Sequence, residues 1–165
     1  MNYLLDANTY IQAKNEYYQM NVCPGYWDWL DSQFEAGYLA SVSLVYDELK
    51  DFGDELSLWV KERKDQFLDV SDDATQAKFV EIAQHVAELQ DLKPGNLENF
   101  LGGADPWLIA KAKSIGAVVV THEVLAPESA RKIKVPNVCK KFGVDYLNTF
   151  QLLRQMEACF VLKNN

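Results

Sequence analysis

The fold of this chain is decided by the stretch DPWLIAKAKSIGAVVVTHE, residues 105–123. Its first part predicts a helix, in which Asp105 is suited to the cap position with Pro106 following it, and which Gly116 ends. Apolar residues recur there at helical spacing: Leu108, Ile109, Ala112 and Ile115. The run 117–121 then predicts a buried strand. A helix leading directly into a buried strand is half of a crossover unit and indicates an α/β fold.

The rest of the chain alternates short apolar runs with amphipathic helical patterns. Besides 117–121, strands are predicted at residues 2–5, 38–42, 68–70, 132–135 and 144–147. The longest helical pattern covers 72–92, and a closing helix is predicted over 149–159. This alternation predicts a three-layer α/β/α sandwich with a mainly parallel central sheet. At 165 residues and 48% hydrophobic, the chain suits one domain spanning 1–165.

Composition excludes several classes of protein. No apolar run has the length of a membrane span, and the N-terminus lacks the basic-then-apolar order of a signal peptide. We therefore expect a cytoplasmic protein with no membrane partner. Three scattered cysteines and two histidines argue against a disulfide framework or a zinc centre, so free thiols are expected.

The net charge of -8 conceals an asymmetry along the chain. Residues 1–110 carry 7 basic and 20 acidic side chains, whereas residues 111–165 carry 9 basic and 4 acidic ones. A local anion-binding surface is compatible with that distribution, although a merely solvated face explains the charge equally well. The candidates for contacts with a phosphate backbone are Arg131, Lys132, Lys134, Lys140 and Lys141.

Four isolated acids follow apolar runs or lie on helices expected to border them: Asp6, Glu48, Asp105 and Glu123. Packing explains such residues poorly, because burying an unpaired charge costs several kcal/mol. In an open α/β sheet the ends of the strands are where ligands bind. Carboxylates that converge there are suited to a hard divalent cation such as Mg2+.

The contexts of these acids resemble a known family, the PIN-domain nucleases, and within it the VapC-like toxins of toxin–antitoxin pairs. The motifs that carry the resemblance, in order and spacing, are LLDAN at 4–8, VYDEL at 45–49, DPWLIAKA at 105–112 and VVVTHE at 118–123. The resemblance implies that Asp6, Glu48 and Asp105 bind metal, and that Asn8 orients one of the acids. Glu123 stands where most relatives have aspartate.

The substitution at Glu123 lengthens the side chain by one methylene, so this residue reaches metal through water or holds only a second metal. Thr121 is expected to support the site through its hydroxyl group. Asp47 is adjacent to Glu48 but about 100° round the helix, so it should miss the acids.

The resemblance implies an Mg2+- or Mn2+-dependent endoribonuclease that cleaves RNA phosphodiesters, forms a homodimer and is silenced by a cognate antitoxin. Two alternatives stay open. A phosphatase of the haloacid-dehalogenase type also begins with a strand-end aspartate, but it needs a second acid where this chain has Asn8. A PIN-like module that binds RNA or protein without cutting is compatible with the replacement at Glu123.

Overall fold

The centre of the molecule is a parallel β-sheet, in a computed structural model that describes residues 2–127 and 131–161. Its strands are β1 (Tyr3–Leu5), β2 (Leu39–Val42), β3 (Phe67–Leu68), β4 (Val118–Val120) and β5 (Tyr146–Leu147). They lie in the order β3-β2-β1-β4-β5, and every pairing between them is parallel. Strands buried on both faces form continuous apolar runs, which is why the sequence shows brief runs of Leu and Val. The predicted α/β fold with a parallel sheet is confirmed.

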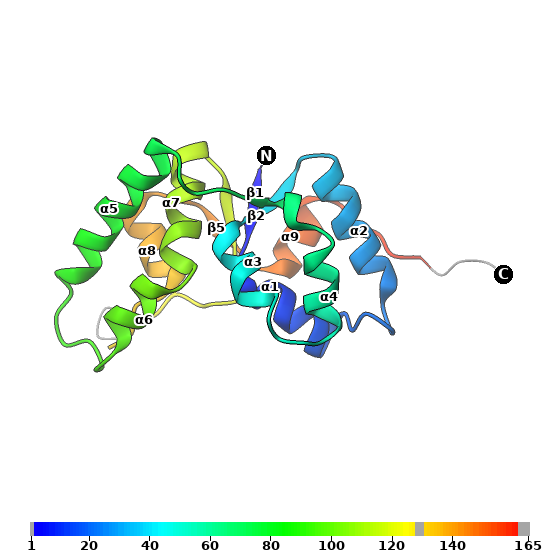
Figure 1. The fold of residues 1–165 in the computed structure, drawn as a ribbon, viewed down its shortest axis with the longest axis horizontal. Helices are drawn as coiled ribbons and strands as arrows, with labels where there is room; N and C mark the ends of the chain where they lie inside the picture. Colours follow the sequence, from blue (N-terminus) through cyan, green and yellow to red (C-terminus); the bar gives the residue numbers. More distant parts are fainter. Residues whose placement is uncertain (1, 128–130, 162–165) are drawn as a thin grey trace.

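Helices cover both faces of the sheet (Figure 1). On the left of Figure 1 lie α5 (Asp73–Ala87), α6 (Asn96–Gly102), α7 (Asp105–Ile115) and α8 (Val135–Phe142). On the right lie α1 (Ala7–Gln12), α2 (Pro24–Glu35), α4 (Glu55–Lys61) and α9 (Thr149–Gln155), with α3 (Ser43–Leu49) near the centre. A π-helical turn, Ala13–Tyr17, extends α1, and a 3-10 turn, Lys64–Gln66, precedes β3.

The order of the strands makes β1 the switch point of the sheet. This strand pairs with β2 on one side and with β4 on the other, and the backbone N–H of Asp6 donates to Val120 O at 2.9 Å. The chain therefore leaves β1 toward one edge of the sheet and later returns to the other edge. Such a switch point, at the carboxyl ends of the strands, is where open α/β sheets bind ligands.

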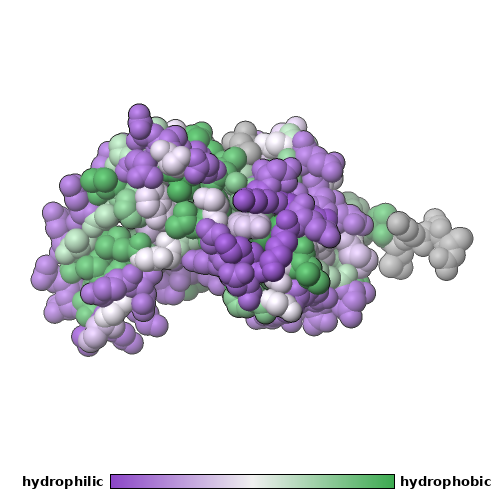
Figure 2. All heavy atoms as spheres, in the orientation of Figure 1, coloured by the Kyte–Doolittle hydropathy of each residue, from purple (hydrophilic) through white to green (hydrophobic). Residues whose placement is uncertain are grey.

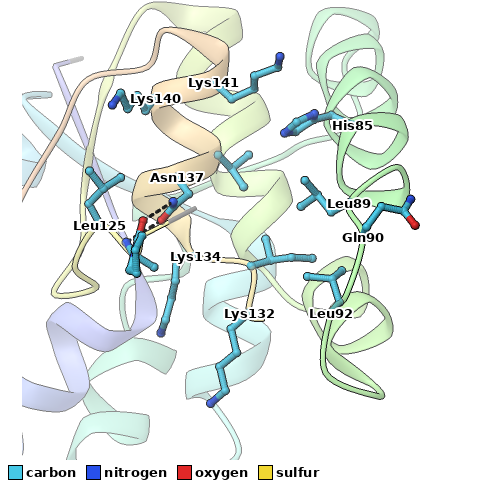
Figure 3. Close-up of a pocket in the computed structure, with 14 residues that line it drawn as sticks. His85, Leu89, Gln90, Leu92, Leu125, Lys132, Lys134, Asn137, Lys140 and Lys141 are labelled. Carbon is cyan, nitrogen blue, oxygen red and sulfur yellow. Dashed lines mark hydrogen bonds between the residues drawn. The ribbon is translucent and has the colours of Figure 1, made fainter. Parts of the chain in front are cut away.

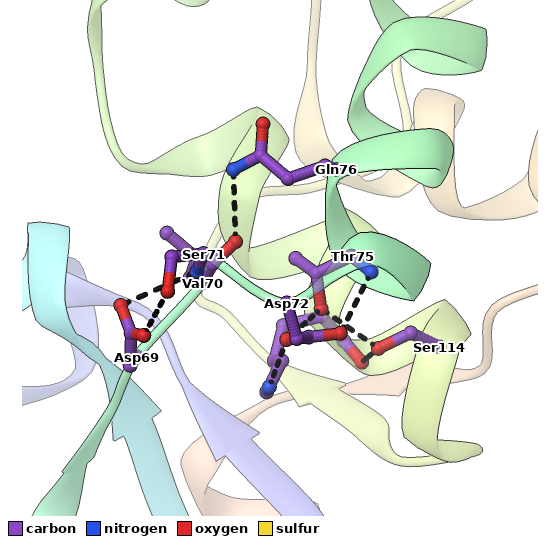
Figure 4. Close-up of polar contacts among 8 residues, drawn as sticks. Asp69, Val70, Ser71, Asp72, Thr75, Gln76 and Ser114 are labelled. Carbon is purple, nitrogen blue, oxygen red and sulfur yellow. Dashed lines mark hydrogen bonds and ion pairs between the residues drawn. The ribbon is translucent and has the colours of Figure 1, made fainter.

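Helix α7 is held in place by polar contacts with α5 (Figure 4). The Asp72 carboxylate caps α5 by accepting from the backbone N–H of Thr75 at 2.9 Å, and it pairs with Lys111 Nζ of α7 at 2.7 Å. The Thr75 and Ser114 hydroxyl groups lie 3.0 Å apart. These contacts join the two longest helices of one layer and so help to fix the orientation of α7, which begins at Asp105.

The prediction of a strand over 132–135 is wrong. Lys134 has extended backbone and precedes α8, which has Pro136 in its first turn and ends at Gly143, whose φ is 61°. The alternation of Lys, Ile, Lys and Val imitated a strand. The sequence does contain a helical pattern, which begins at Val135. The buried residues Val135, Val138 and Cys139 recur at helical spacing. The closing helix is also shorter than predicted, because α9 ends at Gln155.

The surface differs between the parts of the molecule. In the orientation of Figure 1, hydrophilic residues cover the centre, where α3 lies, and hydrophobic side chains gather over α5 and α7 (Figure 2). Within the part of the chain that the structure describes, no helix is long and apolar enough to cross a membrane. The three cysteines are free, as predicted.

Candidate active site

Asp6 lies at the centre of the candidate site. It follows β1, caps α1 and is only 2% exposed. Its Oδ2 accepts from Thr121 Oγ1 at 2.7 Å and from Asn8 Nδ2 at 3.5 Å, and its Oδ1 accepts from the Asn8 backbone N–H at 3.4 Å. Burial nevertheless raises the pKa of Asp6 to about 6, against these hydrogen bonds, and the charges of Glu123 and Glu48 add to the rise.

Asp105 does not cap α7, contrary to the prediction. The cap position belongs to Ala104, and Asp105 is the first helical residue. Within the described residues, no hydrogen bond is made to its carboxylate. Burial raises the pKa of Asp105 to about 8, and the charges of Asp6, Glu123 and Glu48 contribute to the rise. The charges of Glu48 and Glu123 therefore act on both aspartates, and the charge of Asp6 acts on Asp105.

Glu48 and Glu123 are arranged differently, because each already holds a backbone N–H. Glu48 Oε1 accepts from the backbone N–H of Ala104 at 2.9 Å, at the start of α7. Glu123 Oε2 accepts from the Val135 N–H at 2.8 Å, at the start of α8, and its Oε1 pairs with Lys134 Nζ at 2.6 Å. A carboxylate near a helix N-terminus is favoured by the helix dipole. The two glutamates thus hold the beginnings of two helices.

The donor set suits a hard divalent cation. A buried carboxylate, Asp6, and a half-buried one, Asp105, both with raised pKa values, offer the oxygen donors that Mg2+ and Mn2+ prefer. As arranged here, no group of three or more Asp, Glu, His or Cys side chains in residues 2–127 and 131–161 is already placed to hold a metal. Glu48 and Glu123 each accept a hydrogen bond from a backbone N–H in this arrangement. Mg2+ is often bound through one or two carboxylates and keeps several waters, so a site for it needs no more acids than Asp6 and Asp105.

The predicted basic residues are divided between two places. Lys134 pairs with Glu123 and so belongs to the acidic site. It also lines a pocket of about 770 Å3 between α5 and α8, together with Lys132, Lys140 and Lys141 (Figure 3). In Figure 3, Lys132 and Lys134 extend toward one end of the pocket, and Lys140 and Lys141 lie at the other. Arg131 is exposed and donates from Nε to Asp91 O at 2.9 Å, away from the acids.

Two features escaped sequence reasoning. The pairing of Lys134 with Glu123 joins residues 11 positions apart, and no periodic pattern in the sequence between them signals it. The hydrogen bond from Ala104 to Glu48 was also missed, because these residues are 56 positions apart in the chain. Asp47 pairs with Lys50 at 2.5 Å on the exposed side of α3, away from the acids as predicted.

Comparisons with known proteins bear on this geometry. A family model described as "Domain of unknown function (DUF4411)" matches residues 3–160. The chain belongs to this family. No curated protein shows significant similarity to it.

Among solved structures, this DUF4411 chain is similar to "Crystal structure of VapBC2 from Rickettsia felis bound to a DNA fragment from their promoter". The TM-score is 0.53 at 18% sequence identity, and the match covers 90% of this chain and 98% of the other. At that identity the likeness shows the fold. The predicted VapC-like, PIN-type resemblance is confirmed at this level.

Proposed function

We propose that this protein is a metal-dependent endoribonuclease and the toxin of a type II toxin–antitoxin pair. The observation that carries the proposal is the convergence of the buried Asp6 and the half-buried Asp105 at the switch point of a parallel sheet, where the pKa values of both carboxylates are raised. With Glu48 and Glu123 they are the residues that would hold Mg2+ or Mn2+. When bound, the cation would neutralise these charges, activate water for attack on a phosphodiester and stabilise the leaving oxygen.

The protein's own side chains prepare this site. Thr121 and Asn8 donate to Asp6 and hold its carboxylate in one orientation. Glu48 fixes the backbone immediately before Asp105. Lys134 brings a positive charge to the acids, where it is placed to contact a phosphate group of the substrate.

The preference for RNA comes from the family resemblance, and unpaired segments are the natural target of selective RNA cleavage. Lys132, Lys140 and Lys141 line the pocket that begins at Lys134, and they support a path for the phosphate backbone away from the acids. An antitoxin partner, a homodimer and a cytoplasmic location belong to the same proposal. The likeness in fold to VapBC2, which was solved with DNA, supports the toxin–antitoxin part.

The decisive experiment is cleavage of a mixed RNA pool by the purified protein with Mg2+ or Mn2+. We expect defined cleavage products that disappear with EDTA and with the Asp105→Asn variant, prepared identically to control for contaminating nuclease. A single-stranded DNA pool, tested in parallel, distinguishes RNA from DNA as the substrate. Products that persist equally with EDTA or with Asp105→Asn would contradict the proposal.

A non-cutting binding module is the second candidate, favoured by the engagement of Glu48 and Glu123 with backbone groups. It predicts RNA binding without products at any metal concentration, so the same experiment separates the two. A dehalogenase-type phosphatase finds less support, because the residue two positions after Asp6 is Asn8, whose amide donates to Asp6. Hydrolysis of p-nitrophenyl phosphate would test that reading directly.

A further inference from the structure

Three aromatic rings gather beside the acids, in the helical layer opposite the lysine pocket. Tyr17 ends the π-helical turn after α1, His122 follows β4, and Phe150 lies in the first turn of α9. The Tyr17 and Phe150 ring centroids are 4.9 Å apart with an edge-to-face angle of 79°. The His122 ring lies 6.0 Å from that of Tyr17 and 5.8 Å from that of Phe150. The three residues form one cluster from three separate segments.

The cluster is joined to the acids through the backbone at the end of β4. His122 stands between Thr121, which donates to Asp6 at 2.7 Å, and Glu123, which pairs with Lys134. The imidazole is held by a contact of 2.9 Å between His122 Nε2 and Thr149 Oγ1. The segment 121–123 therefore contacts Asp6, Lys134 and the aromatic cluster.

Core packing does not explain the cluster. Tyr17 is 46% exposed, whereas the core tyrosines Tyr10 and Tyr26 are each 1% exposed. Phe150 and His122 are half-buried. A group of packed aromatic rings that is partly open to solvent at the carboxyl end of β4 is a surface on which flat, unpaired bases can stack.

We propose that Tyr17, His122 and Phe150 form a stacking platform for one unpaired nucleobase next to the phosphodiester that is cut. This inference rests on the proposed function. It adds which side of the site contacts a base of the RNA. Lys134 and the pocket lysines lie in the α5–α8 layer, and the platform lies in the α1–α9 layer. A single-stranded RNA that passes over the acids would place its phosphates toward the α5–α8 layer and one base toward the α1–α9 layer.

The test is binding of a short, unstructured RNA of mixed sequence to the full chain carrying Asp105→Asn, so that cleavage does not intervene. Tyr17→Ala should weaken affinity roughly tenfold, because base–aromatic stacking is sensitive to removal of the ring. Tyr17→Phe should bind like the parent. The matched control is Tyr38→Ala, since Tyr38 is 49% exposed but precedes β2, at the amino ends of the strands and so opposite the ends that bear the acids.

A series of RNAs, each with one abasic position, locates the stacked base. At one position the abasic RNA should bind more weakly to the parent, and Tyr17→Ala should then cost nothing further. RNA with 4-thiouridine at that position should crosslink to the peptide containing Tyr17. An unchanged affinity for Tyr17→Ala, an equal loss in Tyr38→Ala or Tyr17→Phe, or no RNA binding at all would overturn the platform.

The failures of the two proposals differ. If RNA binds and Tyr17→Ala weakens it, but the parent protein with intact Asp105 never cuts, the platform stands and the nuclease does not. If the protein with intact Asp105 cuts RNA and Tyr17→Ala changes nothing, the nuclease stands and the platform does not.

Discussion

The two aspartates and the two glutamates of the site differ in what surrounds their carboxylates. Asp6 and Asp105 have raised pKa values, and within residues 2–127 and 131–161 neither carboxylate forms an ion pair. Glu48 and Glu123 are turned to backbone N–H groups that begin α7 and α8, and Glu123 also pairs with Lys134. The glutamates therefore help to position the helices, whereas burial and the neighbouring acids disfavour the charges of the aspartates, an effect that a bound cation would relieve.

The largest expected effect is on catalysis by the aspartates. Asp6→Asn or Asp105→Asn should each lower the rate of RNA cleavage by about 10^3-fold, because each removes a charge that the metal needs. The double variant should lose little more, since both residues serve one site. Single-turnover cleavage rates measure this, with Asp47→Asn as the matched control on exposed surface. Independent, multiplicative losses would show that the two aspartates do not share a metal.

The second prediction concerns stability without metal. The folded protein keeps protons on the aspartates up to pKa values of about 6 and about 8, whereas the unfolded chain loses them near pH 4. The metal-free protein should therefore lose stability as pH rises from about 4 to about 8 and level off above that. Asp105→Asn should remove much of this slope and raise stability at pH 8.

Urea unfolding in EDTA at several pH values between 5 and 9 measures that slope. Adding Mg2+ to the parent protein should restore stability at pH 8, and should do so less in Asp105→Asn. The same dependence of stability on pH in both proteins would show that the pKa of Asp105 is not raised in the folded protein.

The third prediction addresses Glu123. Glu123→Gln keeps an acceptor for the Val135 N–H but loses the charge opposite Lys134, so activity should fall mainly at low Mg2+ and recover with more metal. Glu123→Asp should retain activity, yet it should lose about 1 kcal/mol of stability, because the shorter side chain no longer reaches both partners. Metal titrations of the cleavage rate and urea unfolding give the two readouts. A complete loss of activity in Glu123→Asp would mean that the site is built around the longer side chain.

The smallest expected effect lies farthest from the acids. Lys140→Glu with Lys141→Glu should weaken RNA binding several-fold and reduce its salt dependence, because phosphate contacts release counterions. Affinity is measured against salt on the Asp105→Asn background, and Mg2+ stabilisation of the protein with intact Asp105 should be unchanged. Lys61→Glu with Lys64→Glu, in the other helical layer, is the charge-matched control. An unchanged salt slope would place the RNA path outside the pocket.

Local pattern alone determined a large part of this protein. The apolar runs ending at Leu5 and Val120 became neighbouring parallel strands, and the stripe of Leu108, Ile109 and Ala112 became the buried face of α7. Burial on both faces leaves a direct mark on composition, because each strand must be apolar throughout. The acids could be singled out because they follow or border these apolar runs, where burying a charge without a partner is unfavourable.

Tertiary structure decided what the acids contact. Asp105 was predicted as a cap but is the first residue of α7, and the backbone N–H of Ala104 before it donates to Glu48 from another helix. The meeting of Glu123 with Lys134, and of Tyr17 with Phe150, joins segments that no repeat or spacing relates. Helical and strand periodicities report only which face of a segment is buried. The strand order, with β1 at the centre of the sheet, decides which buried faces pack together. It thereby also decides which charges come to lie close to one another.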